Sequence, residues 1–189
     1  MADQILKEKP TRQLGTQKLF SSIGSGSYGE VFISCSDSTY TEILRRNKVD
    51  PSDQILACKR ISLRNPNTNQ LYGPQRLKLI EEEIKMAERL NHPNTVRFID
   101  TFKTHNAHYI FMEFCDEGDL LKFIPKFNKE KFGIDYVVKT LKEDDARYVI
   151  REVVLGLSYL NSNLIMHRDI KLENIMVKKK PSAYRNEGG

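Results

Sequence analysis

The chain has 189 residues, of which 39% are hydrophobic and 29% charged, and its formal net charge is +5. This length suits one ordinary domain, and nine Phe with eight Tyr can supply a core. No apolar run of about eighteen residues occurs, and MADQILKEKP at the start lacks the apolar core of a signal peptide, so we expect neither a membrane span nor a secreted protein.

The basic balance does not by itself indicate a nucleic-acid partner. The 30 basic residues are interleaved with 25 acidic ones, which is typical of a solvated surface, and we expect no nucleic-acid binding. Three cysteines lie far apart without metal-ligand spacing (Cys35, Cys58 and Cys115). Such a sparse, odd count indicates a reducing compartment, so we expect a soluble, intracellular, cytoplasmic protein.

The first part of the chain is rich in predicted strands. Residues 1–17 are polar, and we expect a loose N-terminal segment. Residues 18–35, KLFSSIGSGSYGEVFISC, predict two strands around a Gly-rich turn, whereas the polar residues 36–54 predict a long connection. A strand follows at 55–63 and a loop at 64–74. A helix is predicted next by the three- and four-residue steps of Leu77, Ile80, Ile84 and Ala87.

Two more strands, TVRFIDTF and HYIFMEF, precede a change to helical character after Gly118. Thr140 and Glu143 form a capping-box pattern, in which side chains satisfy backbone N–H groups at the start of a helix. The helix predicted over 144–161 has one apolar face, made of Ala146, Val149, Ile150, Val153, Leu157 and Leu160. We therefore expect an α+β protein in two parts that join near residues 113–118.

The run HRDIKLEN at 167–174 contains the clearest chemistry. Asp169, Lys171 and Asn174 supply a base, a cation and a neutral metal ligand within six positions, a set suited to phosphoryl transfer. Upstream, Gly24, Gly26 and Gly29 form a GxGxxG loop. A strand-like run follows its last glycine, so the pattern predicts a hairpin and not a dinucleotide-binding turn, which needs a helix there. An ordinary Gly-rich hairpin is the alternative.

Taken in order, GxGxxGxV, the Ala57-Cys58-Lys59 strand and the 167–174 loop resemble eukaryotic protein kinases, and Lys171 favours the Ser/Thr type. HPNTVRFID and MEFCDEGDL resemble segments of the Unc-51-like and NimA-related kinases. The resemblance implies a β-rich small lobe with one αC helix over 18–114. It implies a hinge and the start of a helical large lobe over 115–177, and a polar tail over 178–189.

The resemblance also implies an ATP site. Lys59 would hold the α- and β-phosphates, and Glu83 would orient it, although Glu81 and Glu82 lie beside it on the same helix. Gly24, Gly26 and Gly29 would let backbone N–H groups approach the phosphates. The implied adenine and ribose contacts are the gatekeeper Met112, the backbone of Glu113 and Cys115, Asp119, and the covering residues Ile23, Val31, Ala57 and Met176. These apolar residues could equally be core, because a cofactor pocket is itself an apolar cavity.

For catalysis, the resemblance implies that Asp169 receives the substrate proton, Lys171 contacts the γ-phosphate and Asn174 holds Mg²⁺. The implied function is an ATP-dependent Ser/Thr protein kinase acting on a protein hydroxyl. No Asp-Phe-Gly follows Asn174 before Gly189, so we expect a truncated chain with an incomplete large lobe and little or no activity alone. A partner would cover the exposed large-lobe surface. The alternative is a non-catalytic, pseudokinase-like module that binds nucleotide or a partner.

Overall fold

The computed structural model describes residues 2–26, 29–50, 53–65, 67–132 and 140–179. The chain forms two compact units, and its path crosses between them more than once. The first unit consists of Met1–Asn91 and Arg97–Phe114, and the second of His92–Val96 and Cys115–Gly189. The last of these crossings, after Phe114, coincides with the change from strands to helices that the sequence predicted near residues 113–118.

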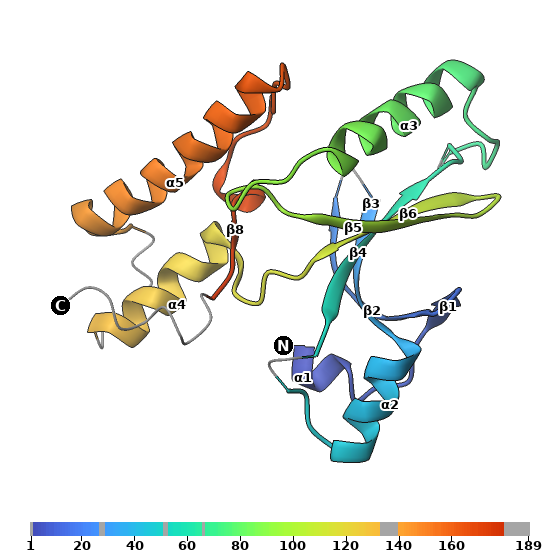
Figure 1. Ribbon diagram of the computed structural model, residues 1–189, viewed down its shortest axis with the longest axis horizontal. Helices are drawn as coiled ribbons and strands as arrows, with labels where there is room; N and C mark the ends of the chain where they lie inside the picture. The colour runs from blue at the N-terminus through green and yellow to red at the C-terminus, as the bar shows by residue number, and fades with distance from the viewer. Residues whose placement is uncertain (1, 27–28, 51–52, 66, 133–139, 180–189) are drawn as a thin grey trace. The chain divides into compact units, whose positions relative to one another are not determined.

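An antiparallel sheet of six strands forms the body of the first unit, in the order β1-β2-β3-β4-β6-β5 (Figure 1). Its strands are β1 (Arg12–Leu14), β2 (Gln17–Gly26), β3 (Gly29–Ser36), β4 (Ile55–Ser62), β5 (Phe98–Lys103) and β6 (Ala107–Glu113). The strands predicted over 18–35, over 55–63 and in TVRFIDTF and HYIFMEF are confirmed. Strand β4 is central, because it pairs with β3 on one side and with β6 on the other.

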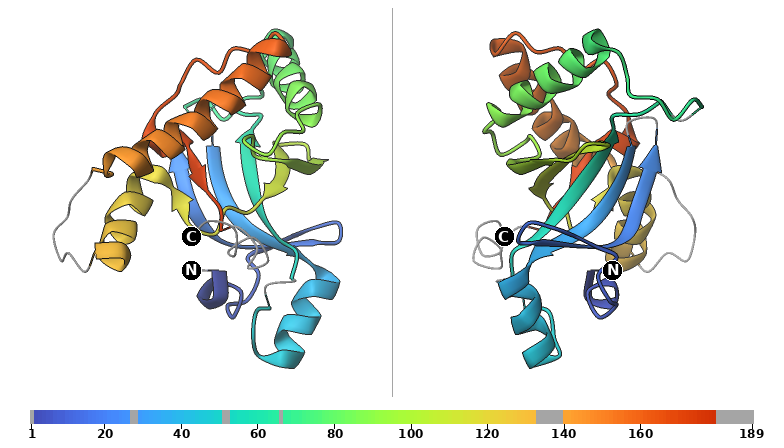
Figure 2. Two further views of the ribbon diagram at one scale, coloured as in Figure 1. Left: turned by 60° about the vertical axis from the view of Figure 1, so that its left-hand side comes forward. Right: turned by 90° about the vertical axis from the view of Figure 1, so that its right-hand side faces the viewer.

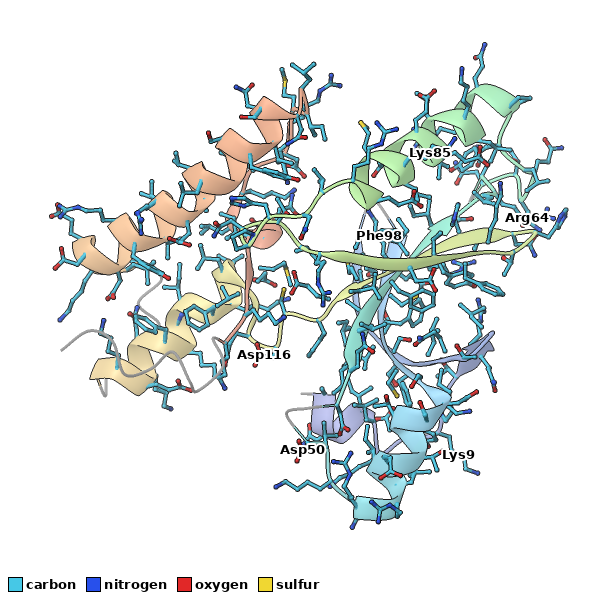
Figure 3. All side chains as sticks on the ribbon, in the orientation of Figure 1. Lys9, Asp50, Arg64, Lys85, Phe98 and Asp116 are labelled. Carbon is cyan, nitrogen blue, oxygen red and sulfur yellow. The ribbon has the colours of Figure 1, made fainter. Side chains whose placement is uncertain are left out.

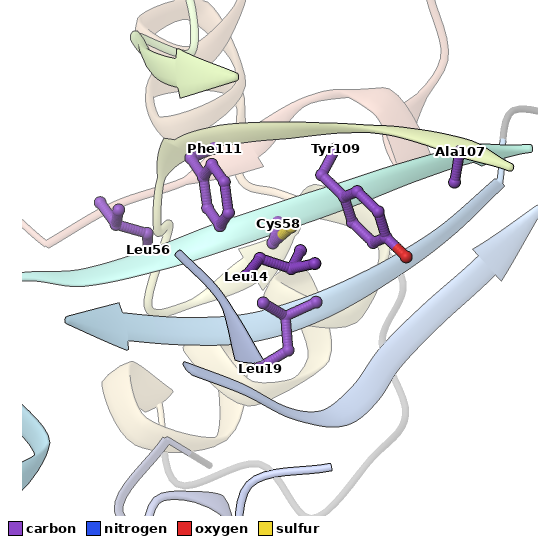
Figure 4. Packing of buried hydrophobic residues seen from close by; sticks show 7 residues of the cluster. All are labelled: Leu14, Leu19, Leu56, Cys58, Ala107, Tyr109 and Phe111. Carbon is purple, nitrogen blue, oxygen red and sulfur yellow. The ribbon is translucent and has the colours of Figure 1, made fainter. Parts of the chain in front are cut away.

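Side chains that alternate along β6 pack into two different parts of the core. Tyr109 and Phe111 belong to a buried cluster with Leu14, Leu19, Leu56, Cys58 and Ala107 (Figure 4). Ile110 packs instead with Ile80 and Ile84 of helix α3 (Pro74–Glu88). The predicted helix is confirmed, and Pro74 at its first turn fits the missing N–H of a proline. Just after β4, Arg64 (Figure 3) donates from Nε to Asn106 Oδ1 at 2.7 Å.

The connection predicted over residues 36–54 is wrong in part, because helix α2 (Asp37–Arg46) occupies its first half. Ser36 caps this helix, with its Oγ accepting a hydrogen bond from the Thr39 N–H at 3.1 Å. Asn47 ends it in the left-handed conformation, with φ of 50°. Ile43 is only 2% exposed, so the helix has an apolar face despite its polar composition.

The N-terminal segment is also more ordered than predicted. It forms the short helix α1 (Ala2–Ile5) and strand β1, and Leu6 between them is completely buried. In its described residues the first unit therefore contains three helices, where the sequence predicted one. The views in Figures 1 and 2 place α1 and α2 together at one end of the sheet and α3 at the other.

The second unit contains helices α4 (Leu120–Phe132) and α5 (Glu143–Ser162), the 3₁₀ turn η1 (Leu172–Asn174), and a ladder of β7 (Gly118–Asp119) with β8 (Met176–Val177). The predicted helix over 144–161 is confirmed, but its predicted capping box is wrong. Lys142 is the N-cap and makes no side-chain cap bond, while the Thr140 carbonyl accepts from Asn128 Nδ2 at 2.8 Å. Across the described residues, no helix is long and apolar enough to cross a bilayer.

Residues 92–96 belong to the second unit because they pack on α5. The His92 ring stacks on Tyr159 with centroids 4.8 Å apart, and Asn94 Nδ2 donates to Glu152 Oε2 at 2.9 Å. A Cβ on Gly156 would lie 2.7 Å from the Asn94 carbonyl oxygen, so this helix position requires glycine for the close approach.

We expect Gly29→Ala to lower the free energy of unfolding by at least about 1–3 kcal/mol. Backbone strain at a positive φ alone costs that much in a residue other than glycine, and the new Cβ adds a steric clash. Gly29 has φ of 118°, and an added Cβ would lie 2.1 Å from the Arg60 carbonyl oxygen. Chemical denaturation followed by circular dichroism measures the change. Gly24→Ala is the matched control, since a Cβ there meets nothing within 4 Å. Equal stability of the two variants would contradict the prediction.

Candidate active site

The structure divides the predicted site residues between the two units. Those in the first unit lie on the β2–β3 hairpin, on β4, on α3 and at the end of β6: Ile23, Gly24, Gly26, Gly29, Val31, Ala57, Lys59, Glu83, Met112 and Glu113. Those in the second unit lie on the β7–β8 ladder, on η1 or in the segments beside them: Cys115, Asp119, Asp169, Lys171, Asn174 and Met176.

The Gly-rich loop is a hairpin, as its strand-like flanks predicted. Gly24 pairs with Val31, and Gly26 pairs with Gly29 at the hairpin end of the ladder. Val31 is in register with Lys59 on the next strand. The ladder therefore brings the glycine loop and Lys59 into neighbouring positions of one sheet, as a phosphate-binding role requires.

Lys59 occupies a half-buried position in the middle of β4. Burial lowers the pKa of its ammonium group, and the negative charge of Glu83 acts in the opposite direction. The two neighbouring glutamates have other partners: Glu81 pairs with Lys103, and Glu82 with Lys78 at 3.8 Å. Of the three candidates, Glu83 is thus the one whose charge the structure links to Lys59, which supports its assignment.

The apolar residues assigned to adenine differ in their surroundings. Ala57 and Met112 are in register across β4 and β6, and Met112 packs against the cluster under α3. Ile23 packs instead in a separate cluster with Phe20 and Ile33. At the end of β6, Glu113 exchanges backbone and side-chain hydrogen bonds with Arg97: its N–H donates to the Arg97 carbonyl at 2.9 Å, and its Oε1 accepts from the Arg97 N–H at 2.7 Å. The backbone contacts of Glu113 and Cys115 with adenine stay predictions.

In the second unit, the three residues predicted for catalysis meet in one cluster. Asn174 Nδ2 donates to both the backbone oxygen and the Oδ2 of Asp169, at 2.8 Å each. Lys171 Nζ lies 3.0 Å from the same Oδ2. The Lys171 ammonium first, and Asn174 next, hold the pKa of Asp169 below its usual value. Asp169 is therefore a carboxylate at neutral pH, able to accept a proton or a hydrogen bond.

His167 supports this cluster from the backbone side. Its Nδ1 accepts a hydrogen bond from the Asp169 N–H at 3.3 Å, so the ring acts as a local structural acceptor, and Arg168 between them adopts φ of 65°. The amide nitrogen of Asn174 donates its hydrogen bonds to Asp169. The side-chain oxygen Oδ1 is therefore the atom of Asn174 that could bind a cation. The described residues contain no group of three or more His, Cys, Asp or Glu placed to bind a metal.

Asp119 has a partner that the sequence did not reveal. Its Oδ1 accepts from the Lys122 N–H at 2.9 Å, and its Oδ2 lies 2.8 Å from Lys122 Nζ. Asp119 thus caps the start of α4, and the D-x-x-K spacing is the sequence signal for this arrangement. Asp119 is also in register with Met176 across the short ladder, so the residues predicted to contact ribose and adenine lie side by side.

A second ion-pair cluster fixes β8, the strand that follows the 167–174 loop. Glu117 has a side chain only 5% exposed, and it pairs with Lys126 at 2.5 Å and Lys179 at 2.7 Å. These two lysines, Lys126 first, lower the pKa of Glu117. The Lys179 N–H also donates to Asp116 (Figure 3) at 2.9 Å. The segment after β8 is therefore fixed to the segment before β7.

Comparison with known proteins identifies the family of the chain. Residues 18–184 match the family described as protein kinase domain. The mitogen-activated protein kinase kinase kinase ANP1 of Arabidopsis thaliana is 30% identical over 158 residues, which cover 84% of this chain and 20% of that protein. The serine/threonine-protein kinase pakB of Dictyostelium discoideum is 30% identical over 175 residues, covering 93% of this chain and 17% of that protein.

Among solved structures, the crystal structure of Rad53 1-466 in complex with AMP-PNP matches 87% of this chain and 35% of that one, with a TM-score of 0.63 and 21% identity. At this identity the likeness concerns the fold. The chain belongs to the protein kinase family, and relatives named serine/threonine kinases place it with that type. It spans between 17% and 30% of the length of the curated relatives it matches. The likeness to Unc-51-like and NimA-related kinases stays a prediction.

We expect Glu83→Gln to lower the pKa of Lys59 further, because it removes the negative charge that opposes the effect of burial. A ¹³C NMR titration of labelled lysine measures this pKa directly. Glu82→Gln is the matched control, since Glu82 is the adjacent helix residue and pairs with Lys78. A Lys59 pKa that both substitutions shift equally, or that neither shifts, would contradict the assignment of Glu83.

Proposed function

We propose that this chain is the nucleotide-binding and catalytic-loop portion of an ATP-dependent Ser/Thr protein kinase. The reaction would transfer the γ-phosphoryl group of ATP to a Ser or Thr hydroxyl of a protein substrate. One observation carries the proposal: Asp169, Lys171 and Asn174 meet within hydrogen-bond distance in a single loop. The Rad53 crystal structure, which has a similar fold, is a complex with AMP-PNP, and this further supports nucleotide binding.

Each residue has a defined task in this proposal. Lys59, oriented by Glu83, binds the α- and β-phosphates, and the glycine loop lets backbone N–H groups approach them. The ionised Asp169 accepts the proton of the attacking hydroxyl and orients its oxygen. Lys171 balances the negative charge of Asp169 and of the γ-phosphate. The residues proposed to contact the nucleoside are Met112 and Glu113 in the first unit and Cys115 and Asp119 in the second.

Asn174 is the one residue of the 167–174 loop that we propose as a Mg²⁺ ligand. Its Oδ1 is a neutral oxygen donor, and this cation would need carboxylate and nucleotide phosphate oxygens to complete the site. When bound, the ion would neutralise charge that develops on the phosphate oxygens. The 189 residues provide Asn174 but no Asp-Phe-Gly. We therefore expect this polypeptide by itself to turn over weakly or not at all, since losing one charge-stabilising group costs on the order of 10²–10³ in rate.

A non-catalytic module that binds nucleotide or a partner is the second candidate. The observation that favours it lies on α5, where Ile150, Val154 and Leu155 are 63%, 55% and 42% exposed. Exposed apolar patches of this kind are typical of surfaces that bind another protein, so a partner protein would cover this face of α5. In either case we propose a cytoplasmic location, in agreement with three cysteines that are free thiols.

We expect Mg²⁺-ATP to bind the 189-residue chain, and Lys59→Met and Asn174→Ala each to weaken binding about tenfold to a hundredfold. This range corresponds to about 1.5–3 kcal/mol for a hydrogen bond to a charged group. Isothermal titration calorimetry measures the dissociation constants. Lys78→Met is the control, because Lys78 is an exposed lysine that pairs with Glu82.

The outcomes separate the two candidates. Binding that both variants weaken, together with phosphorylation of a protein when the chain is extended through an Asp-Phe-Gly segment, supports the kinase. Binding without phosphorylation by the extended chain supports the non-catalytic module. Absence of nucleotide binding in the unmodified chain would rule out the proposed kinase site.

A further inference from the structure

Ile23, a predicted adenine contact, and Phe114, which lies between two others, pack against a single buried cluster. Ile23 precedes the glycine loop, and Phe114 lies between Glu113 and Cys115. Both are partly buried against one cluster at the α1–α2 end of the sheet. The members of that cluster, which we call the α1–α2 layer, are Leu6, Phe20, Ile33, Cys35 and Ile43.

Helix α2 is fixed to strand β2 by polar and apolar contacts. Lys18 Nζ lies 2.7 Å from Asp37 Oδ1, and the rings of Phe20 and Tyr40 lie 5.3 Å apart. Ile43 points into the layer and is 2% exposed. The strand that leads to the glycine loop is therefore held by α2 over the residues just before Ile23.

The N-terminal segment closes the same layer. Leu6 is completely buried, the Tyr40 hydroxyl donates to the Glu8 carbonyl at 3.3 Å, and Ser21 Oγ donates to Glu8 Oε2 at 2.6 Å. These bonds join α2, the N-terminal segment and β2. Because buried side chains are close-packed, removing volume from the layer lets its partly buried neighbours move, and Ile23 and Phe114 are such neighbours.

We infer that the α1–α2 layer positions the adenine side of the nucleotide site, with Ile43 as a positioning residue that acts through Ile23 and Phe114. Ile43 lies on α2, outside the elements that the sequence assigned to nucleotide binding. The inference rests on the proposed function, because it concerns the same nucleotide. It assigns to α2 and the N-terminal segment a role in affinity beyond that of filling space.

The test compares Ile43→Ala and the milder Ile43→Val with Leu14→Ala. Leu14 is 7% exposed in the cluster that contains Tyr109 and Phe111, and that cluster contains none of the predicted adenine residues. Dissociation constants for Mg²⁺-ATP and for adenosine are measured by calorimetry at a temperature where circular dichroism shows each variant folded. We expect Ile43→Ala to weaken both ligands by the same factor, about twofold to thirtyfold, as distant coupled residues do.

The controls separate positioning from general destabilisation. Ile43→Val should weaken both ligands by a smaller factor, Leu14→Ala by less than about twofold, and Lys59→Met should weaken ATP but not adenosine. Unchanged affinities in folded Ile43 variants, or an equal loss in Leu14→Ala, would overturn the inference alone. If Ile43→Ala does not fold, Ile43→Val decides. An unmodified chain that binds neither ligand would overturn the proposed function as well.

Discussion

The most demanding constraint on the first unit is one ammonium group, that of Lys59, in a half-buried position on the central strand β4. Burial disfavours the charged form, so the group needs a fixed backbone and a nearby negative charge. The backbone is fixed because β4 pairs with strands on both sides, where Val31 and Ile110 are in register with Lys59. The charge comes from Glu83, and α3 can supply it only because Ile80 and Ile84 hold that helix on the sheet.

The second unit assembles its charged cluster by a different route. Asp169 and Asn174 are five residues apart, and the turn η1 closes the loop between them. Local hydrogen bonds therefore do most of the positioning of Asp169 and Asn174. This loop conformation requires one residue, Arg168, in the unfavourable left-handed region. The longer-range contribution comes from Glu117, whose two lysine partners fix the strand that follows the loop. The Asp169 cluster therefore forms with few tertiary contacts, whereas the position of Lys59 depends on many.

Much of the fold could be predicted where one periodicity dominates, as in β4, α3 and α5. Helix α2 could not, because its apolar face consists mainly of Tyr40 and Ile43 among charged residues, and the Ser36 and Asn47 caps were the better signal. Thr140 was misassigned because its pattern matches a capping box, while its carbonyl is used by Asn128. In the site, motif spacing placed Asp169, Lys171 and Asn174 in one loop, and the family resemblance selected Glu83. The ion partner of Glu81 could not be predicted, because Lys103 lies on a strand whose distance from α3 the sequence does not give.

The packing of residues 92–96 on α5 has a consequence for how the chain can be divided. The backbone passes between the two units three times, after Asn91, after Val96 and after Phe114. A protease that cuts only after Phe114 leaves the His92–Tyr159 stack and the Asn94–Glu152 hydrogen bond intact. These two contacts would then still join the piece that ends at Phe114 to the piece that contains α5. Cutting the chain at Phe114 therefore does not separate the two units cleanly. A gene fragment ending at Phe114 would encode residues 92–96 without α5, the helix on which they pack.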